Sequence, residues 1–128
     1  MSAQIDDIIH RALAEDAPWG DVTSEAFIPA GASASAALVA REEGVLSGGG
    51  VFARVFELVD ADTSVELGLD DGEPFAPGAV LARVHGTAHA VLRAERIALN
   101  LVQRMSGIAT LTARYVAAVK GTRARILD

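Results

Sequence analysis

The chain has 128 residues, the length of one domain with a modest core, and 51% of its residues are hydrophobic. This composition argues against disorder, and the lack of an apolar run of about eighteen residues argues against a membrane span. Zero cysteines exclude disulfides and thiolate catalysis. Acidic Asp6 and Asp7 stand where a signal peptide has basic residues, so we expect a cytoplasmic protein.

The net charge of −6 is distributed unevenly along the chain. Residues 1–87 carry four basic and fifteen acidic side chains, whereas residues 88–125 carry seven basic side chains and Glu95 as their one acid. An acidic body disfavours nucleic acid as a partner, while a basic helical end suits small anions such as carboxylates or phosphates. Each arginine of that end could equally solvate a helix face or pair with the acidic body.

The N-terminal segment predicts a helix followed by a polar loop. Apolar residues at helical spacing over 4–15 end before Pro18, which disfavours a continued helix. The loop EDAPWGDVTS carries carboxylates without the spacing of a calcium loop. Trp19 is expected to pin this loop to the body.

Two strands and a second helix are expected next. Small and aliphatic residues over 33–41 predict one strand, and a shorter strand follows over 44–48. Glycines 48–50 lack the Lys and Ser/Thr of a phosphate-binding loop. They are interpreted as a flexible approach to a core helix over 51–59.

The middle of the chain predicts further strands. Alternation over 63–69 is typical of a half-buried strand, and a turn at Pro77-Gly78 leads into a strand over 79–85. Thr87 is placed to cap the helix that follows. Because strands and helices do not alternate as in a parallel sheet, the order indicates an α+β fold with a mainly antiparallel sheet and packed helices.

Two alternatives concern the same region. His85 and His89 are four residues apart and could form a metal pair, but they straddle a strand-to-helix junction. The segment DGEPFAPGAVLARVHG resembles the hairpin repeats of biotinyl and lipoyl carrier domains. Those carriers need a lysine on an exposed hairpin, and the one lysine here is Lys120, at the end of a helix.

The stretch 91–119 has the longest helical character. One side is apolar at three-to-four spacing, which predicts a buried face made of Val91, Leu92, Ala98, Leu99, Val102 and Met105. A second, polar stripe consists of Arg93, Arg96, Asn100 and Gln103. Arg96 therefore points toward solvent or a ligand.

Glu95 is turned toward the apolar side of this helix, where an unpaired charge is costly. We expect it to form an ion pair with a neighbouring arginine and to hold that guanidinium in one geometry. The pair would be structural alone or would also serve ligand binding.

The C-terminal pattern predicts a break, a second helix and a strand. Ser106-Gly107 interrupts the periodicity, so Ser106 is expected to cap a helix over 108–119, with a corner before it. Lys120-Gly121-Thr122 ends that helix, and a strand begins at Arg123. A strand that starts so late suggests the front portion of a longer protein.

Several segments together resemble one enzyme family. RAERIALNLVQRMSGIAT and LAEDAPWGDVTS are similar to the central and N-terminal motifs of the quinolinate phosphoribosyltransferases, also called carboxylating nicotinate-nucleotide pyrophosphorylases. REEGVLSGGGVF falls in the expected place between them, and KGTRARILD leads up to the family's Thr-Arg-Lys motif. Molybdenum-associated relatives of the ModD type share much of this pattern and stay an alternative with a different ring substrate.

The resemblance implies an enzyme that joins quinolinate to phosphoribosyl pyrophosphate with Mg²⁺, giving nicotinate mononucleotide, pyrophosphate and CO₂. It implies a sandwich-like N-terminal domain over 1–108 and the start of an otherwise missing α/β barrel over 109–128. Two chains would pair as a homodimer or higher even oligomer, without a membrane or nucleic-acid partner.

The resemblance also implies the role of single residues. Arg96, in the Ala-Glu-Arg motif, would reach the quinolinate carboxylate in the partner subunit, with Glu95 and Asn100 as supporting residues. No catalytic residue or metal ligand is expected in this chain, which alone is expected to be inactive. The alternative class is a non-catalytic module for dimerisation or assembly.

Overall fold

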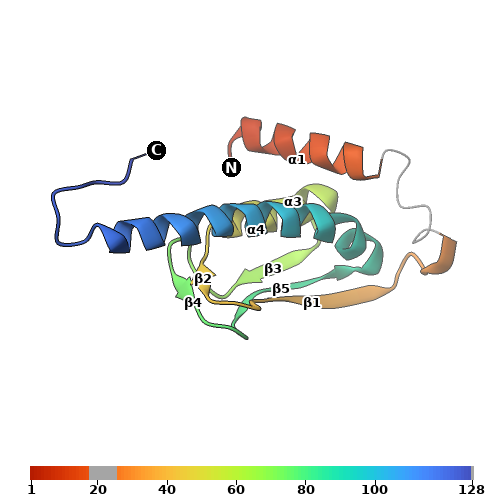
Figure 1. Cartoon of the computed structure of the whole chain (residues 1–128). Coiled ribbons are helices and arrows are strands. Elements are labelled where there is room, and N and C mark those ends of the chain that lie inside the picture. The colour runs from red at the N-terminus through yellow and green to blue at the C-terminus, as the bar shows by residue number, and fades with distance from the viewer. Residues whose placement is uncertain (18–25, 128) are drawn as a thin grey trace.

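The computed structural model describes residues 1–17 and 26–127. The elements in order are α1 (Ala3–Asp16), β1 (Ser33–Val39), β2 (Gly44–Val45), α3 (Gly49–Val59), β3 (Ser64–Leu67), β4 (Pro74–Phe75), β5 (Val80–Thr87) and α4 (Ala88–Ala118). The helices lie on one side of the sheet and leave its other face open (Figure 1). The predicted α+β class is confirmed.

The main sheet has the strand order β1-β5-β3, and a smaller sheet joins β2 to β4. All of these pairings are antiparallel, as expected. Alternation along β5 places Ala82 and Val84 in the core, whereas Arg83 and His85 are exposed on the open face. The sheet is therefore apolar toward the helices and polar on its other side.

The core lies between the sheet and the helices. The largest fully buried side chains are Ile9 of α1, Val55 of α3 and Leu46, which directly follows β2. The rings of Phe52 and Phe56, one turn apart on α3, contact each other in a tilted arrangement with centroids 5.1 Å apart. Burial of each large aliphatic side chain contributes roughly 1.5–3 kcal/mol, so α1 and α3 are held mainly by this packing.

Helix α4 runs without interruption through Ser106-Gly107. The prediction of a corner there is therefore wrong. The Ser106 hydroxyl accepts the backbone N–H of Ser47 at 3.0 Å and donates to the Ser47 carbonyl at 3.1 Å. One turn later, Thr110 Oγ1 accepts the N–H of Val45 at 2.9 Å and donates to the Ser106 carbonyl at 2.7 Å. Ser106 thus fastens α4 to the segment after β2, and Thr110 fastens it to β2 itself; Ser106 caps no new helix.

The buried side of α4 follows the predicted face with one exception. Leu92 is 39% exposed, because it lies about 100° around the helix from buried Val91. The buried residues are Ala90, Val91, Ala94, Ile97, Ala98 and Val102. At the other end, Thr87 caps the helix as expected, accepting the N–H of Ala90 at 3.2 Å.

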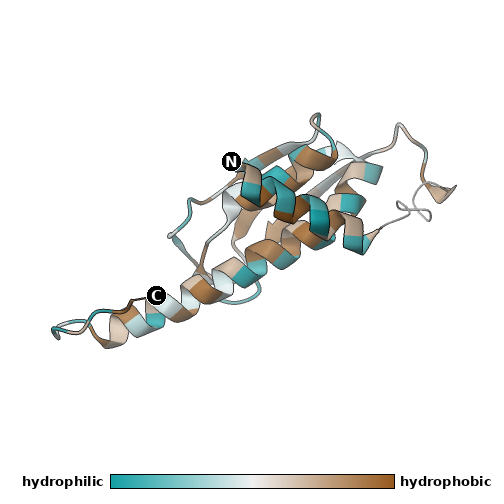
Figure 2. Ribbon diagram, turned by 90° about the horizontal axis from the view of Figure 1, so that it is seen from above, coloured by the Kyte–Doolittle hydropathy of each residue, from teal (hydrophilic) through white to brown (hydrophobic). Residues whose placement is uncertain are grey.

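The C-terminal half of α4 projects beyond the body and carries both hydrophobic and polar residues (Figure 2). Its large apolar side chains are more than half exposed; they are Ile108, Leu111, Tyr115 and Val116. None of the helices in the described ranges combines the length and apolarity needed to cross a membrane.

Glycines 48–50 form the N-cap and first residues of α3, not the flexible approach to a helix that the sequence suggested. The Asp71 carboxylate accepts the N–H groups of Gly48 and Gly49, each at 2.9 Å. Gly48 has φ +89°, and a Cβ there would lie 2.6 Å from the sulfur of Met105 on α4. Charge at the helix N-terminus and close helix packing together fix this turn.

The end of α4 agrees with the prediction, but the strand after it does not. Thr122 Oγ1 donates to the Val119 carbonyl at 2.6 Å, and Gly121 has φ +83°. Residues 123–127 form no strand, so that prediction is wrong for these residues. An isolated extended segment lacks the neighbouring strand that its backbone hydrogen bonds require.

Candidate functional site

Arg96 lies on α4 and contacts the last residue of α1. Its Nη1 is 3.3 Å from Oδ1 of Asp16. The Arg96 side chain is 74% exposed, whereas the Asp16 side chain is 23% exposed. The guanidinium therefore stands at the surface, with a more deeply placed carboxylate against one of its nitrogens.

The rest of the predicted polar stripe surrounds this arginine. Arg93, Asn100 and Gln103 are all exposed on α4, as the spacing predicted. Arg93 lies three residues before Arg96 and Asn100 four residues after it, so both are its neighbours on one face. The stripe presents two guanidinium groups and two amides to any anion that approaches it.

Glu95 does not hold Arg96, and the predicted ion pair is wrong. Glu95 is exposed and forms no salt bridge with residues 1–17 or 26–127. It borders a hollow of about 80 Å³ whose lining includes Leu38 and Phe56, in line with its predicted turn toward the apolar side. Sequence spacing could not find Asp16, because that residue comes from a distant helix.

Among the described residues, Asp16 is the one ion-pair partner of Arg96 and lies against a single nitrogen of its guanidinium. A guanidinium carries five N–H donors in a rigid plane and grips a carboxylate best with two parallel bonds. Within the described ranges, Asp16 engages Nη1 alone. Among residues 1–17 and 26–127, none pairs with the edge formed by Nε and Nη2, where a second carboxylate could bind.

Arg54 of α3 also pairs with carboxylates, but both its Nε/Nη2 edge and its Nη1 have partners. Its Nε and Nη2 donate to the two oxygens of Asp6 at 2.9 and 2.8 Å, and its Nη1 lies 2.8 Å from Oε2 of Glu57. The Arg54 side chain is 26% exposed. The hydrogen bonds that Arg54 donates to Asp6 hold the pKa of Asp6 below its usual value, and acceptance by Asp6 and Glu57 raises the pKa of Arg54.

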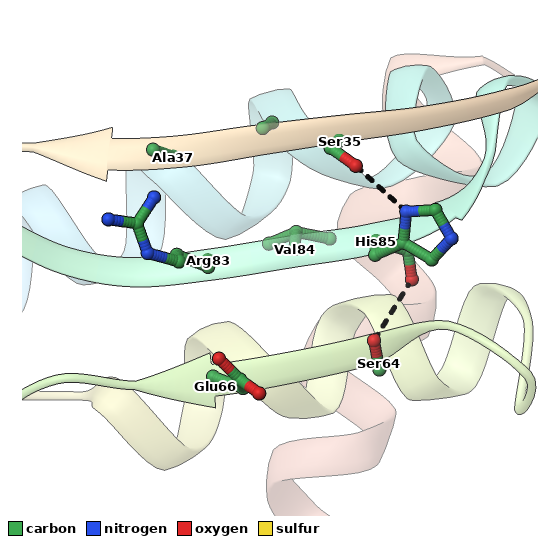
Figure 3. A pocket seen from close by; sticks show the side chains of 8 residues that line it. Ser35, Ala37, Ser64, Glu66, Arg83, Val84 and His85 are labelled. Atoms are coloured by element: carbon green, nitrogen blue, oxygen red, sulfur yellow. Dashed lines mark hydrogen bonds between the residues drawn. The ribbon is translucent and has the colours of Figure 1, made fainter.

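A separate polar hollow of about 410 Å³ lies on the open face of the sheet (Figure 3). Ser35 Oγ is 2.8 Å from Nδ1 of His85, and Ser64 Oγ donates to the His85 carbonyl at 3.4 Å. Glu66 and Arg83 line the same hollow. Neighbouring strands thus hold His85 on the side of the sheet opposite to the helices.

His85 and His89, considered as a metal pair, contact different partners. His89 places Nε2 2.8 Å from the carbonyl of Ile28, while His85 contacts Ser35. In the part of the chain that the structure describes, no three His, Asp or Glu side chains are grouped as metal ligands.

The described residues include only the first part of the N-terminal motif, up to residue 17. Asp16 belongs to LAEDAPWGDVTS and makes the contact with Arg96. The prediction that Trp19 pins the loop to the body falls outside the described residues.

Comparison with known proteins gives one consistent family. Residues 21–106 match the family described as "Quinolinate phosphoribosyl transferase, N-terminal domain". The carboxylating nicotinate-nucleotide pyrophosphorylase of Mycobacterium leprae is 42% identical over 125 residues, which are 95% of this chain and 44% of that protein. A quinolinate phosphoribosyltransferase of Nicotiana tabacum is 42% identical over 106 residues, covering 82% of this chain and 30% of that protein.

Solved structures agree with the sequence relatives. The crystal structure of NadC from Streptococcus pyogenes superimposes with a TM-score of 0.90 at 38% identity, over 95% of this chain and 44% of that one. The chain therefore spans less than half the length of these relatives. The family match covers most of the chain, and the chain belongs to the quinolinate phosphoribosyltransferase N-terminal domain family.

Proposed function

We propose that this chain is the N-terminal part of an enzyme that converts quinolinate and phosphoribosyl pyrophosphate to nicotinate mononucleotide, pyrophosphate and CO₂, in the biosynthesis of NAD. The relatives named above carry this activity in their names. Below, the full-length protein means this chain together with the C-terminal part that such relatives possess.

Arg96 is the residue that supports the proposal most. Its guanidinium is 74% exposed, with the Nε and Nη2 edge free of the described residues. Planar, bidentate recognition is what a carboxylate requires, and Arg supplies it better than Lys. We assign Arg96 to a quinolinate carboxylate in the active site of a partner subunit, with Asn100 as a neighbouring donor.

The chemistry explains why a site of this kind needs cations. Quinolinate carries two carboxylates on adjacent ring carbons, and these must approach an anionic pyrophosphate donor. Fixed positive groups offset the repulsion and orient the ring before bond formation. Arg96 would bind and orient substrate without exchanging a proton, since arginine stays protonated.

Mg²⁺ is proposed for the full-length protein. Among residues 1–17 and 26–127, no His, Asp or Glu side chains are grouped as metal ligands. In the full-length protein, the ion would stabilise the pyrophosphate leaving group through residues of the C-terminal part. The cytoplasmic location expected from the sequence stays a prediction.

The projecting half of α4 supports the view that more polypeptide packs there. Ile108, Leu111 and Tyr115 are each more than half exposed, which is unfavourable for an isolated helix end. The division at residue 108 stays a prediction, since α4 runs through it. The same apolar surface favours the second candidate, a non-catalytic assembly module.

Two assays test the proposed function. The isolated chain should release no pyrophosphate from quinolinate and phosphoribosyl pyrophosphate above a buffer control, whereas the full-length protein should. In the full-length protein, Arg96→Ala should weaken quinolinate binding and leave phosphoribosyl pyrophosphate binding nearly intact. A full-length protein that turns over neither substrate would favour the assembly module, and one that prefers another ring would favour a ModD-type substrate.

A further inference from the structure

We propose that Asp16 is a positioning residue for Arg96: it holds Nη1 so that the Nε and Nη2 edge of the guanidinium faces the substrate carboxylate. This inference rests on the proposed function of Arg96. It adds a residue from the N-terminal motif to a site for which the central motif alone supplied candidates.

The geometry of Arg54 indicates what the Arg96 site lacks. At Arg54, one carboxylate takes Nε and Nη2 and a second takes Nη1. At Arg96, Asp16 takes Nη1, and no described residue takes the other edge. A planar carboxylate from a ligand would complete at Arg96 the arrangement that Asp6 and Glu57 complete at Arg54.

Burial of the two partners supports a positioning role over a merely stabilising one. The Asp16 side chain is 23% exposed and ends a helix that is anchored through buried Ile9 and Leu13. The Arg96 side chain is 74% exposed and would otherwise sample many rotamers. Exposed ion pairs add little to stability, but a fixed carboxylate restricts the arginine before the ligand arrives.

Simple charge arithmetic predicts the opposite effect, which makes the inference testable. Asp16 is an anion close to the place proposed for an anionic substrate, and repulsion alone would make its removal improve binding. Positioning predicts that its removal weakens binding, because the guanidinium loses its fixed orientation.

The experiment compares variants of the full-length protein by steady-state kinetics. Asp16→Asn should raise the KM for quinolinate about five- to tenfold, with kcat within twofold and the KM for phosphoribosyl pyrophosphate unchanged. Asp16→Glu, which keeps the carboxylate, should have a KM for quinolinate close to that of the unaltered protein. The matched control Glu15→Gln removes the same charge one residue away, where no described ion pair forms, and should behave like the unaltered protein.

Arg96→Ala separates this inference from the proposed function. If Arg96→Ala raises the KM for quinolinate and Asp16→Asn does not, Asp16 has no positioning role and the function of Arg96 stands. If Arg96→Ala leaves quinolinate binding unchanged, the proposed role of Arg96 fails as well. In the Arg96→Ala background, Asp16→Asn should have no further effect; a full additional effect there, or tighter quinolinate binding by Asp16→Asn, would overturn the inference.

Discussion

Arg54 and Arg96 each join α1 to another helix, yet they differ in what surrounds the guanidinium. Arg54 is 26% exposed and bound by two carboxylates, whereas Arg96 is 74% exposed and contacts one described carboxylate at 3.3 Å. Arg54 has satisfied its donors within the fold and serves the structure. Arg96 has one such partner among the described residues, and this difference indicates which arginine could bind a ligand.

The largest expected contrast comes from truncating each arginine in the full-length protein. Arg96→Ala should raise the KM for quinolinate about 10- to 100-fold, because a charge-assisted bidentate contact is lost, and should leave the melting temperature almost unchanged. Arg54→Ala should leave that KM unchanged and lower the melting temperature by a few degrees, since Asp6 loses its hydrogen-bond donors. Kinetics and calorimetry on the same samples would test both expectations. A raised KM in Arg54→Ala, or a lowered melting temperature in Arg96→Ala, would contradict them.

Replacing each arginine by lysine asks whether two-pronged geometry matters more than charge. Arg96→Lys keeps the positive charge but not the planar fork, so the KM for quinolinate should rise about tenfold. Arg54→Lys should affect thermal stability alone. An Arg96→Lys enzyme with unaltered quinolinate affinity would mean that a point charge suffices at this site.

The stabilisation from the Arg54–Asp6 pair should depend on pH in the acid range. The pKa of Asp6 lies below its usual 3.8 in the folded protein, so its stabilising contribution is complete above the unfolded pKa and is lost as pH falls through the lower, folded value. The difference in melting temperature between the unaltered chain and Asp6→Asn should therefore be constant from about pH 7 to pH 5 and shrink below about pH 4. A difference that grows on acidification would contradict this assignment.

The smallest expected effect is the stability coupling between Asp16 and Arg96. With the arginine 74% exposed, a double-mutant cycle on thermal unfolding should give less than about 0.5 kcal/mol. Added salt should reduce that coupling further. A coupling well above this value would place Arg96 with Arg54, as a structural residue.

Much of the fold follows from local patterns. Helical spacing and turn residues predicted the order of the elements and the antiparallel sheet, because these depend on neighbours within a few positions. The exposed stripe with Arg93, Arg96 and Asn100 followed from the same periodicity. It could be predicted because one apolar face fixes the orientation of the whole helix.

Two of the errors, at Ser106 and Glu95, arose where a side chain has a partner distant in sequence. Ser106 looked like a cap because its hydroxyl could serve a helix start, yet it bonds to the backbone of Ser47. Proximity in sequence predicts an ion pair between Glu95 and an arginine of the same helix. The carboxylate that contacts Arg96 is instead Asp16, which lies on another helix. Local spacing does not encode these tertiary contacts, and the Asp16 contact belongs to the candidate site.

Binding of a substrate carboxylate to the Nε and Nη2 edge of Arg96 is tested most directly by NMR. The Arg96 Nε–H signal would be observed in the full-length protein during titration with quinolinate. We expect this signal to shift and its exchange with water to slow as quinolinate saturates the site, while the Arg54 Nε–H signal, already bonded to Asp6, stays in place. An Arg96 signal that remains unchanged at saturating quinolinate would contradict the account.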